Sequence, residues 1–502
     1  MRNIFKRIER NHYLTPGTHG HGFNGYLDTA QAFASTWEGQ DDLLTVLSGV
    51  SSALGNDPAN TVDHLIADVN YLDANRDHTD GIWGSALHAD DKLKRFTSRD
   101  YVLATANAKN SFGFKKYPLF VQLNTLATKV LFKDSGIINK TPKAIGIEYL
   151  EGSYLYSADP AYNASQQGTP GRAYARKEVI LSGGAFNSPQ LLKLSGIGPA
   201  DELAQHGIPL VKDLPGVGAR LQDNYEVPIV GHAQRDFVQP PPATTPSGES
   251  CTFNFGPPGT DPCLNLWLEK GTGPYSLMST LNAIFRKTPY VPPNTYNERD
   301  MYLVGGYFAL RGFYPPTDSI PMDPPNTFGL STVKIHPQST QGTVRLRSAD
   351  PRDTPIINFN LFPAGNEAGN DLDLNAELDT IKWARRIFAS IPAPIGPIMP
   401  SEPPCLTASG LPDADGSCDD ETDKEWVRNQ IFGHHPTSTC AIGADSDPMA
   451  VLDSKFRVRG VKGLRVVDAS SFPRVPGAFP VLPTFMISEK ASDVIAADAG
   501  LW

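Results

Sequence analysis

The 502-residue chain has no long hydrophobic run. None of its apolar stretches approaches the roughly 18 residues that a helix needs to span a bilayer. Its first residues, MRNIFKRIERNHYL, are charged and lack the apolar centre of a secretory signal peptide. The sequence therefore predicts no membrane-spanning segment and no membrane partner, and the chain as written carries no targeting signal.

Positive charge is also scarce. Lys and Arg number 44 against 54 Asp and Glu, which gives a net charge of −10 with His neutral. Proteins that bind nucleic acid concentrate positive charge on one face, so this balance argues against a nucleic-acid partner. Hydrophobic residues make up 40% of the chain and charged residues 20%, as in proteins that bury a large core. The 44 Gly and 44 Pro indicate many turns and long connections.

The chain has five cysteines, and four of them form two close pairs. Cys251 and Cys263 flank one Gly/Pro-rich loop, Cys405 and Cys418 flank another, and Cys440 is left single. Such pairs suit disulfides formed in an oxidising compartment. The alternative is a cytosolic protein with five buried thiols.

Two tripeptides, Asn139-Lys-Thr141 and Asn163-Ala-Ser165, match the acceptor sequence for N-linked glycosylation. Together with the cysteine pairs they lead us to expect a secreted, extracellular glycoprotein. Its signal peptide is then expected upstream of this chain.

Several segments predict regular structure. Residues 38–55 place apolar side chains at helical spacing and end in Gly. Residues 119–149 contain the β-prone runs LFVQL, KVLF and AIGIEYL, which predict a small antiparallel meander. Residues 178–181 predict a buried strand, and a glycine turn then leads to a helix from about Ser188 to Leu194. A strand, a glycine turn and a helix N-terminus typically cradle a phosphate or another electron-rich group.

The rest of the chain alternates between irregular and regular segments. Residues 235–330 have no sustained period and are interpreted as an insertion, and a second Pro-rich loop covers 391–417. Strand patterns are found in 328–347 and 464–467, and helical patterns in 377–390 and in about 484–497. Both ends of the chain therefore look like parts of an α/β nucleotide domain around a central β-rich region.

Four segments, in this order along the chain, resemble the glucose-methanol-choline (GMC) flavin oxidoreductases: GAFNSPQLLKLSGIG at 184–198, LPGVGARLQD at 214–223, HPTSTC at 435–440 and GLRVVDAS at 463–470. The resemblance covers about residues 1–497 and is weakest between 235 and 325. It implies an α/β fold with a Rossmann-like FAD-binding domain and an antiparallel-sheet α+β substrate domain. The implied divisions are 1–225 (FAD-binding), 226–430 (substrate-binding) and 431–502 (return to the FAD-binding domain with the catalytic histidine).

The family's first strand, Gly-x-Gly-x-x-Gly turn and helix have no counterpart here. A pattern match at Gly20-His-Gly22-Phe-Asn-Gly25 lacks the preceding buried strand and the following helix, so we interpret it as a loop. Residues 4–9 instead resemble a short helix that follows the first nucleotide-binding unit in the family. We therefore expect that the first βαβ unit, roughly 100 to 150 residues, is missing upstream, and that the chain alone binds FAD poorly.

The resemblance makes His435 the catalytic base. Oxidising an alcohol with a flavin requires a group that takes the hydroxyl proton, and a histidine suits this task. The spacing before Cys440 selects His435 rather than its neighbour His434, which we interpret as structural. The family's second catalytic position, usually His or Asn, falls on Phe479, which offers neither donor nor acceptor. Its ring is then an apolar wall for a large or aromatic substrate, or a sign of a non-redox role.

Further residues are implied to contact FAD by position: Ala127 near the adenine, Asp468 and Ala469 near the diphosphate and ribityl chain, and Pro480 and Val481 against the flavin ring. The following helix would aim its positive end at the ring. We do not interpret Cys440 as a nucleophile, since no oxyanion partner is recognisable. No Cys or His cluster has metal-ligand spacing, so no metal is predicted.

The expected function is FAD-dependent oxidation of a small-molecule alcohol, with oxygen or another acceptor reoxidising the flavin. Two alternatives remain open. One is a non-redox FAD-dependent lyase or cyclase on the same scaffold, and the other is a truncated, non-catalytic remnant.

Overall fold

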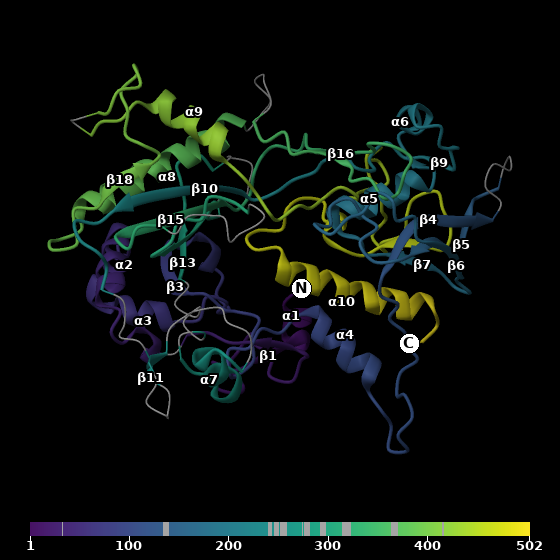
Figure 1. The fold of residues 1–502 in the computed structure, drawn as a ribbon, viewed down its shortest axis with the longest axis horizontal. Helices are drawn as coiled ribbons and strands as arrows, with labels where there is room; N and C mark the ends of the chain where they lie inside the picture. Colours follow the sequence, from purple (N-terminus) through teal and green to yellow (C-terminus); the bar gives the residue numbers. More distant parts are fainter. Residues whose placement is uncertain are drawn as a thin grey trace. The chain divides into compact units, whose positions relative to one another are not determined.

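The computed structural model of the chain describes residues 1–32, 34–133, 140–238, 243–244, 250–251, 259–273, 275, 282–291, 298–313, 323–362, 370–413 and 416–501. These residues form helices, strands and many connecting loops (Figure 1).

The chain divides into two compact units, each assembled from separate stretches of sequence. The first unit holds Met1–Tyr117, Tyr225–Ile335 and Asp371–Phe432, and the second holds Pro118–Asn224, His336–Asn370 and Gly433–Trp502. The chain thus passes between the units close to two of the predicted divisions, while its first 117 residues pack in the first unit. The predicted division into 1–225, 226–430 and 431–502 stays a prediction.

A six-stranded antiparallel sheet organises the first unit. Its strand order is β18 (Met399–Glu402), β10 (Tyr225–His232), β15 (Thr327–Lys334), β14 (Met301–Gly306), β13 (Asn282–Arg286) and β3 (Gly81–Gly84). In its middle, β10 pairs with β15 from Tyr225 opposite Lys334 to His232 opposite Thr327, and every residue of β15 is buried. The antiparallel sheet predicted for this part of the chain is confirmed.

The described residues of 235–330 contain regular structure although the sequence there shows no sustained period, and the interpretation of this stretch as an insertion stays a prediction. This stretch supplies β13 and β14 to the sheet, and it also contains α7 (Pro262–Lys270) and the short antiparallel pair β11 (Ala243–Thr244) and β12 (Ser250–Cys251). Nearly all residues of β13 and β14 are buried. A strand covered on both faces lacks the alternation of apolar and polar residues by which strands are recognised.

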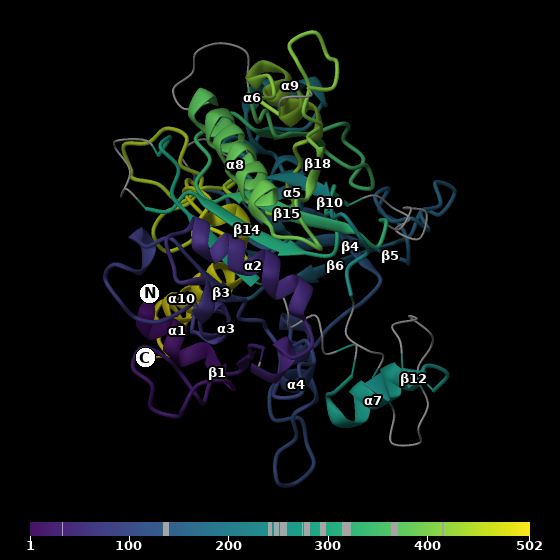
Figure 2. The ribbon, with the colours of Figure 1, turned by 90° about the vertical axis from the view of Figure 1, so that its left-hand side faces the viewer.

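Helix α8 (Asn370–Ser390) lies against this sheet, as Figure 2 shows. The guanidinium of Arg286 in β13 binds the Asp379 carboxylate at 2.7 Å, and the Thr332 hydroxyl of β15 donates to Glu377 at 2.8 Å. Burial raises the pKa of Glu377 to about 8. The helix begins seven residues before the predicted start at 377, because its first turns are polar and show little helical pattern.

The other helices of the first unit are α1 (Arg2–Ile8), α2 (Asp41–Ala53), α3 (Thr61–Ile66), α4 (Ser98–Asn107) and α9 (Asp420–Gln430). The helix predicted over 38–55 is confirmed as α2. Its first turn carries two Asp side chains, and their negative charge stabilises the positive N-terminal end of the helix. The loop predicted over 391–417 includes the short strand β18.

The N-terminal segment confirms the helix predicted near residues 4–9 and the loop predicted at 20–25. After α1, β1 (Glu9–Asn11) pairs in parallel with β2 (Leu27–Thr29), and the glycine-rich loop lies between them. A Cβ atom on Gly22 would lie 1.8 Å from the Lys6 carbonyl oxygen, and one on Gly25 would lie 2.0 Å from that of Ile8. These glycines therefore allow close packing on α1.

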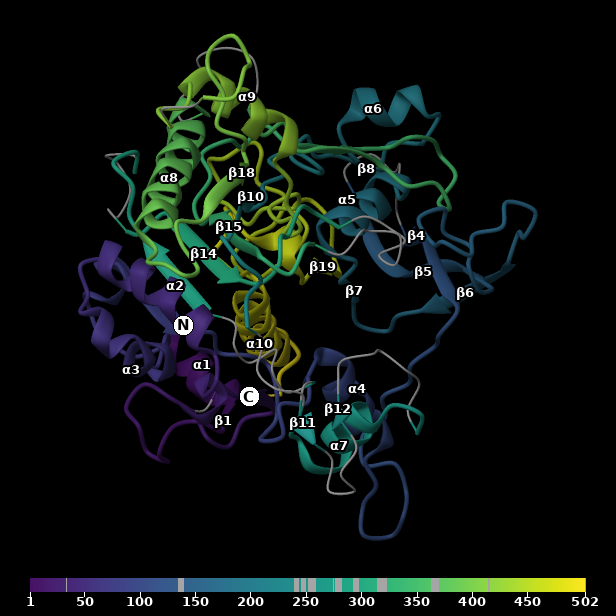
Figure 3. The same ribbon diagram turned by 60° about the vertical axis from the view of Figure 1, so that its left-hand side comes forward.

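A three-stranded antiparallel sheet belongs to the second unit (Figure 3). It consists of β4 (Thr125–Lys133), β5 (Lys143–Glu151) and β6 (Thr169–Tyr174). The predicted meander is confirmed for β4 and β5, but its first strand is wrong. The run LFVQL at 119–123 is not a strand, and Phe120 in it is 81% exposed. Strand propensity alone does not make a strand, because β structure needs a partner in register.

The second unit also contains a parallel pair, β7 (Val179–Leu181) and β19 (Leu464–Val466). Helix α5 (Gly184–Leu194) follows β7, while the single turn η6 (Ala469–Ser471) and then α10 (Val481–Asp498) follow β19. Both helices begin earlier than predicted. Ser188 and Pro189 resemble a helix start but lie inside α5, and Pro483 lies in the first turn of α10, where a missing N–H is tolerated.

The remaining elements of this unit are the parallel pair β8 (Ile197–Gly198) and β9 (Lys212–Asp213), the antiparallel pair β16 (Thr343–Arg345) and β17 (Ile356–Asn358), and α6 (Ala200–Gln205). Side chains from β4, β5, β7, α5 and β19 share one hydrophobic core, which includes Cys440.

The disulfide predicted between Cys405 and Cys418 is confirmed. Cys263 is also disulfide-bonded, while the side chain of Cys251 and the sequon residue Asn139 lie outside the described residues. Cys440 is a buried free thiol. Among the described residues, no helix combines the length and apolar character needed to cross a membrane.

A buried ionic cluster fixes the glycine-rich loop of the first unit. The imidazole of His21, whose side chain is fully buried, lies 3.1 Å from Glu9 Oε1 through Nδ1 and 2.9 Å from Asp68 Oδ2 through Nε2. The Glu9 carboxylate also accepts the Gly22 N–H at 2.8 Å. Burial by itself lowers the pKa of His21, but the hydrogen bonds to Asp68 and Glu9 outweigh it and raise the pKa from 6.5 to about 9.

We predict that His21 makes the stability of the first unit depend on pH. Its pKa is higher in the folded state, so its contribution is complete below pH 6.5 and is lost as pH rises through about 9. Urea unfolding of the wild type, followed by tryptophan fluorescence, should show a loss on the order of 2 kcal/mol over this range relative to His21→Gln. The exposed neighbour provides a control, since His19→Gln should keep the wild-type slope. Parallel pH profiles for wild type and His21→Gln would contradict the assignment.

Candidate functional site

The carboxyl ends of the two parallel strands are joined by one carboxylate. Asp468 directly follows β19 and is 7% exposed. Its Oδ2 atom accepts the Gly184 N–H at 2.9 Å and the Ser188 hydroxyl, both from α5, while its Oδ1 atom accepts the Ser470 N–H at 2.8 Å. This side chain therefore connects the first turn of α5 to the turn η6.

These contacts explain what the strand, glycine turn and helix at 178–194 hold. The sequence predicts a cradle there for a phosphate or another electron-rich group. In the structure the electron-rich group is the carboxylate of Asp468, which takes the N–H of Gly184 at the start of α5. A cofactor phosphate at this helix end would have to displace it.

The segment that carries His435 is attached to the same strand ends. The N–H of Ser438 donates to the Ala469 carbonyl at 3.2 Å, and that of Cys440 donates to the Ser470 carbonyl at 2.8 Å. The Thr439 hydroxyl donates to the Ala185 carbonyl of α5 at 2.6 Å. That carbonyl is available because Pro189, four residues later, has no N–H to fill it.

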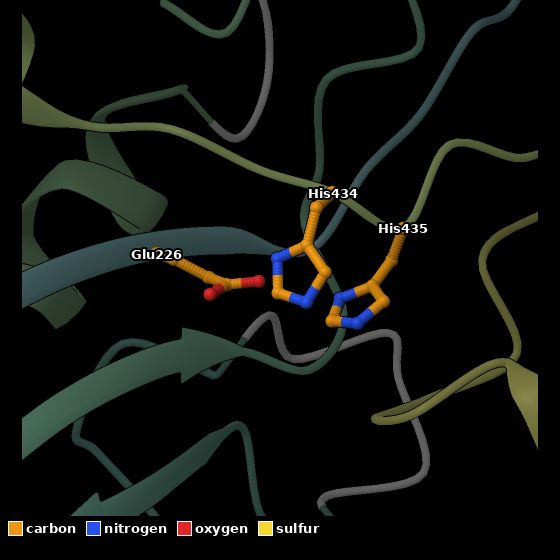
Figure 4. A group of neighbouring side chains, drawn as sticks. All are labelled: Glu226, His434 and His435. Carbon is orange, nitrogen blue, oxygen red and sulfur yellow. The ribbon is translucent and has the colours of Figure 1, made fainter. Parts of the chain in front are cut away.

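The structure brings together the two predicted catalytic positions, His435 and Phe479. Their ring centroids lie 4.8 Å apart with the planes at 52°. The centroid of the His434 imidazole lies 3.8 Å from that of His435, and Figure 4 shows the two imidazoles next to each other. His434 is exposed and His435 is half-buried. The third side chain drawn in that view, Glu226, belongs to the first unit.

Phe479 leads directly into α10, where the predicted contacts of a flavin ring lie. Pro480 caps this helix without a side-chain hydrogen bond, and its first turn has no acidic residue. Phe479 is 36% exposed and Val481 is 51% exposed. Along this apolar 18-residue helix only Ala491 is buried. A positive helix end beside the exposed side chains of Phe479 and Val481 suits a flat ring that becomes negatively charged.

The residues predicted to contact the ribityl chain, diphosphate and adenine of FAD lie in separate elements of the second unit. Ala469 lies in η6, next to Asp468. Ala127 lies in β4, where it pairs with Tyr149 beside a register shift in the strand. Among the described residues, the two glycine-rich turns that could cradle a diphosphate, at 20–25 and 182–184, are already engaged by α1 and by Asp468. The described residues thus fit the flavin ring and provide no open diphosphate cradle.

Cys440 has the surroundings of a core residue. Its side chain is completely buried, and burial raises the pKa of its thiol far above the ordinary value. A thiol held neutral in this way is a poor nucleophile. This agrees with the expectation that Cys440 is not a nucleophile.

Sequence reasoning did not single out Gln222 and Asp223, although both lie in one of the segments that carry the family resemblance. Asp223 is completely buried, and its Oδ1 atom accepts the His435 N–H at 2.6 Å. The only local signal is Gly433, because a Cβ atom there would lie 2.6 Å from the Asp223 carboxyl carbon. That signal is meaningful only once the contact is known.

Comparison with known protein families gives two matches. The N-terminal and C-terminal family models of GMC oxidoreductases match residues 113–226 and 337–488. Mitochondrial choline dehydrogenase of Homo sapiens is 33% identical over 390 residues, which are 76% of this chain and 55% of that protein. The glucose methanol choline oxidoreductase atC of Aspergillus terreus is 34% identical over 384 residues, which are 74% of this chain and 54% of that protein. The matches thus span just over half the length of these relatives.

Solved structures share the fold. A variant of formate oxidase from Aspergillus oryzae RIB40 matches with a TM-score of 0.69 and 20% identity, over 100% of this chain and 78% of that one. A fungal aryl-alcohol oxidase matches with a TM-score of 0.65 and 22% identity, over 99% and 78%. At this identity the likeness establishes the predicted fold class.

We predict that removing the Asp468 carboxylate destabilises the second unit. Asp468→Ala leaves the Gly184 N–H and two buried hydroxyl groups without their acceptor, so the free energy of unfolding should fall by about 2 to 4 kcal/mol. Far-UV circular dichroism during urea unfolding measures the loss. Asp445, whose side chain is 96% exposed, gives the matched control, and Asp445→Ala should change the free energy by less than about 0.5 kcal/mol. Equal stability of the two variants would refute the structural role of Asp468.

Proposed function

The chain belongs to the GMC oxidoreductase family, and on this premise we propose that it acts with FAD to oxidise a small-molecule alcohol, with His435 as the base. The main support is the position of His435. Its segment is hydrogen-bonded to the turn η6 after β19 and to the first turn of α5 after β7. In open α/β folds, ligands bind at the carboxyl ends of parallel strands.

His435 suits proton transfer for chemical reasons. Imidazole titrates near neutral pH, so it can take a hydroxyl proton as the alcohol is oxidised and release the proton afterwards. His435 is half-buried, so part of the residue is accessible. A hydrogen bond from its main-chain N–H to Asp223 holds it without occupying the imidazole.

The residues proposed to contact the flavin ring are Phe479, Pro480, Val481 and the first turn of α10, with Ala469 near the ribityl chain. When bound, FAD supplies the acceptor for the hydride of the carbinol carbon. The exposed apolar side chains of Phe479 and Val481 would exclude water from the ring, and the N-terminus of α10 would stabilise negative charge on it. Ala127 and Asp468 remain the proposed neighbours of the adenine and the diphosphate.

Phe479 bears on the substrate. The ring of Phe479 has no hydrogen-bonding group, so His435 is proposed to orient and deprotonate the alcohol alone. Phe479 is proposed to contact the apolar part of the substrate. This arrangement favours primary alcohols with a large or aromatic side group. Oxygen or another acceptor would then reoxidise the flavin. The absence of a hydrogen-bonding group on Phe479 favours the alternative of a non-redox FAD-dependent lyase or cyclase.

We predict that His435→Gln lowers kcat/KM for alcohols by 10²- to 10⁴-fold, because the proton acceptor is lost. The measurement is anaerobic bleaching of the flavin by a panel of primary alcohols, with FAD supplied. His434→Gln serves as the comparison, since it changes the adjacent ring, and should cost less than about tenfold. Bleaching unaffected by His435→Gln would rule out His435 as the base. Bound flavin that no alcohol bleaches would support the lyase or cyclase, and failure to retain flavin would support a non-catalytic remnant.

We also propose that the protein is secreted and glycosylated. The Cys405–Cys418 disulfide supports an oxidising compartment. Asn163 is exposed, and its side-chain oxygen accepts the N–H of Ser165 at 3.0 Å. The second hydrogen bond, from the Ser165 hydroxyl at 2.7 Å, brings together the two side chains that define the sequon.

We predict that Asn163 carries a glycan when the chain is directed through a eukaryotic secretory pathway. Peptide mass spectrometry before and after N-glycosidase treatment measures its occupancy. Ser165→Ala removes the acceptor sequence and should abolish modification, while leaving Asn163 in place. An unmodified Asn163 in the secreted wild type would contradict the prediction.

A further inference from the structure

Two adjacent residues, Gln222 and Asp223, contact both segments that carry the rings of the candidate site. Asp223 Oδ1 accepts the main-chain N–H of His435 at 2.6 Å, across 212 positions in sequence. The Asp223 side chain is completely buried. An acceptor without access to solvent has little freedom to move, so it can hold the backbone of His435 in one place.

The chain just before His435 lies directly on this carboxyl group. A Cβ atom added to Gly433 would lie 2.6 Å from Asp223 Cγ and 2.8 Å from Asp223 Oδ2. Any other residue at 433 would have to push the backbone away from Asp223. The glycine is therefore required by close approach.

Gln222 forms hydrogen bonds to both the segment that follows His435 and the segment that precedes Phe479. Its carbonyl oxygen accepts the Thr437 N–H at 2.8 Å, two residues after His435. Its side-chain Oε1 accepts the Val475 N–H at 3.2 Å, four residues before Phe479, while its Nε2 donates to the Ser339 carbonyl at 2.9 Å. Gln222 is 3% exposed. One side chain and one carbonyl thus connect the His435 segment to the Phe479 segment.

We propose that Asp223 is a positioning residue for His435, and that Gln222 extends the same clamp to the segment of Phe479. The role of His435 in a reaction rests on the proposed function, whereas the hydrogen bonds that position it do not. The clamp acts on the main chain of the His435 segment, so it fixes the backbone position from which the imidazole extends. The contact of 4.8 Å between the rings of His435 and Phe479 follows from the two segments being held by neighbouring residues.

The decisive experiment measures the His435 main-chain proton directly and needs no activity. Protein labelled with ¹⁵N-histidine gives signals from only 11 His residues, and amide exchange of His435 is followed by NMR. Asp223→Ala should accelerate this exchange by at least about tenfold, while Asp223→Asn should preserve most of the protection because its amide oxygen still accepts. Gly433→Ala should accelerate exchange as well, since it separates the backbone from an intact Asp223.

The matched control is Asp213, an exposed carboxylate of the same unit whose Oδ1 accepts the Ala200 N–H at 3.2 Å. Asp213→Ala should leave His435 exchange unchanged. If Asp223→Ala does not fold, Gly433→Ala and Asp223→Asn complete the test. Unchanged protection of His435 in Gly433→Ala, or in a folded Asp223→Ala, overturns the proposal.

Kinetics separate this inference from the proposed function. In flavin-loaded protein that oxidises alcohols, Asp223→Ala should lower kcat by about 10- to 100-fold with KM within about threefold, because a displaced base affects the chemical step more than binding. Asp223→Asn should restore most of kcat. If the wild type oxidises no alcohol but the exchange results hold, the proposed function fails and the clamp stands. If alcohols are oxidised and Asp223→Ala leaves kcat unchanged, the positioning role is refuted.

Discussion

The second unit depends on one buried carboxylate, Asp468, at the point where two parallel strands end. Each parallel strand is only three residues long, so the strand hydrogen bonds alone are few. Asp468 adds hydrogen bonds to α5 and to the turn η6, and that turn in turn receives the N–H groups of Ser438 and Cys440. The position of the His435 segment therefore follows from the position of Asp468.

A second buried carboxyl group, that of Asp223, also holds a distant segment of the chain through a main-chain N–H group. Both aspartates accept main-chain N–H groups from segments more than 200 positions away in sequence. The two acidic side chains thus hold the chain in place by accepting main-chain N–H groups. The positive end of α10 differs from that of α5, which binds the Asp468 carboxylate. The first turn of α10 has no acidic residue, and the exposed side chain of Phe479 directly precedes it.

Buried charge organises the first unit as well. His21 joins Glu9 to Asp68, and Lys334 of β15 binds Asp300 at 2.7 Å where both are almost completely buried. Burying such groups is unfavourable unless each finds a partner, so they restrict the ways in which the loops and the sheet can pack. The charged residues buried in these strands and loops therefore contribute to the specificity of packing in the first unit.

The sequence by itself determined features whose causes lie within a few residues: helix α2, strands β4, β5, β7 and β19, the Cys405–Cys418 pair, and the family to which the motif around His435 points. It misjudged the start of α5, because Ser188 and Pro189 look like a helix start whether or not a turn precedes them. It also misjudged LFVQL at 119–123 and the strands β13 and β14. A β-prone run becomes a strand only beside a partner, and a fully covered strand shows no alternation. Only the tertiary structure decided that Asp468 occupies the end of α5 and that Asp223 holds His435, because these contacts join residues 284 and 212 positions apart and no local pattern records them.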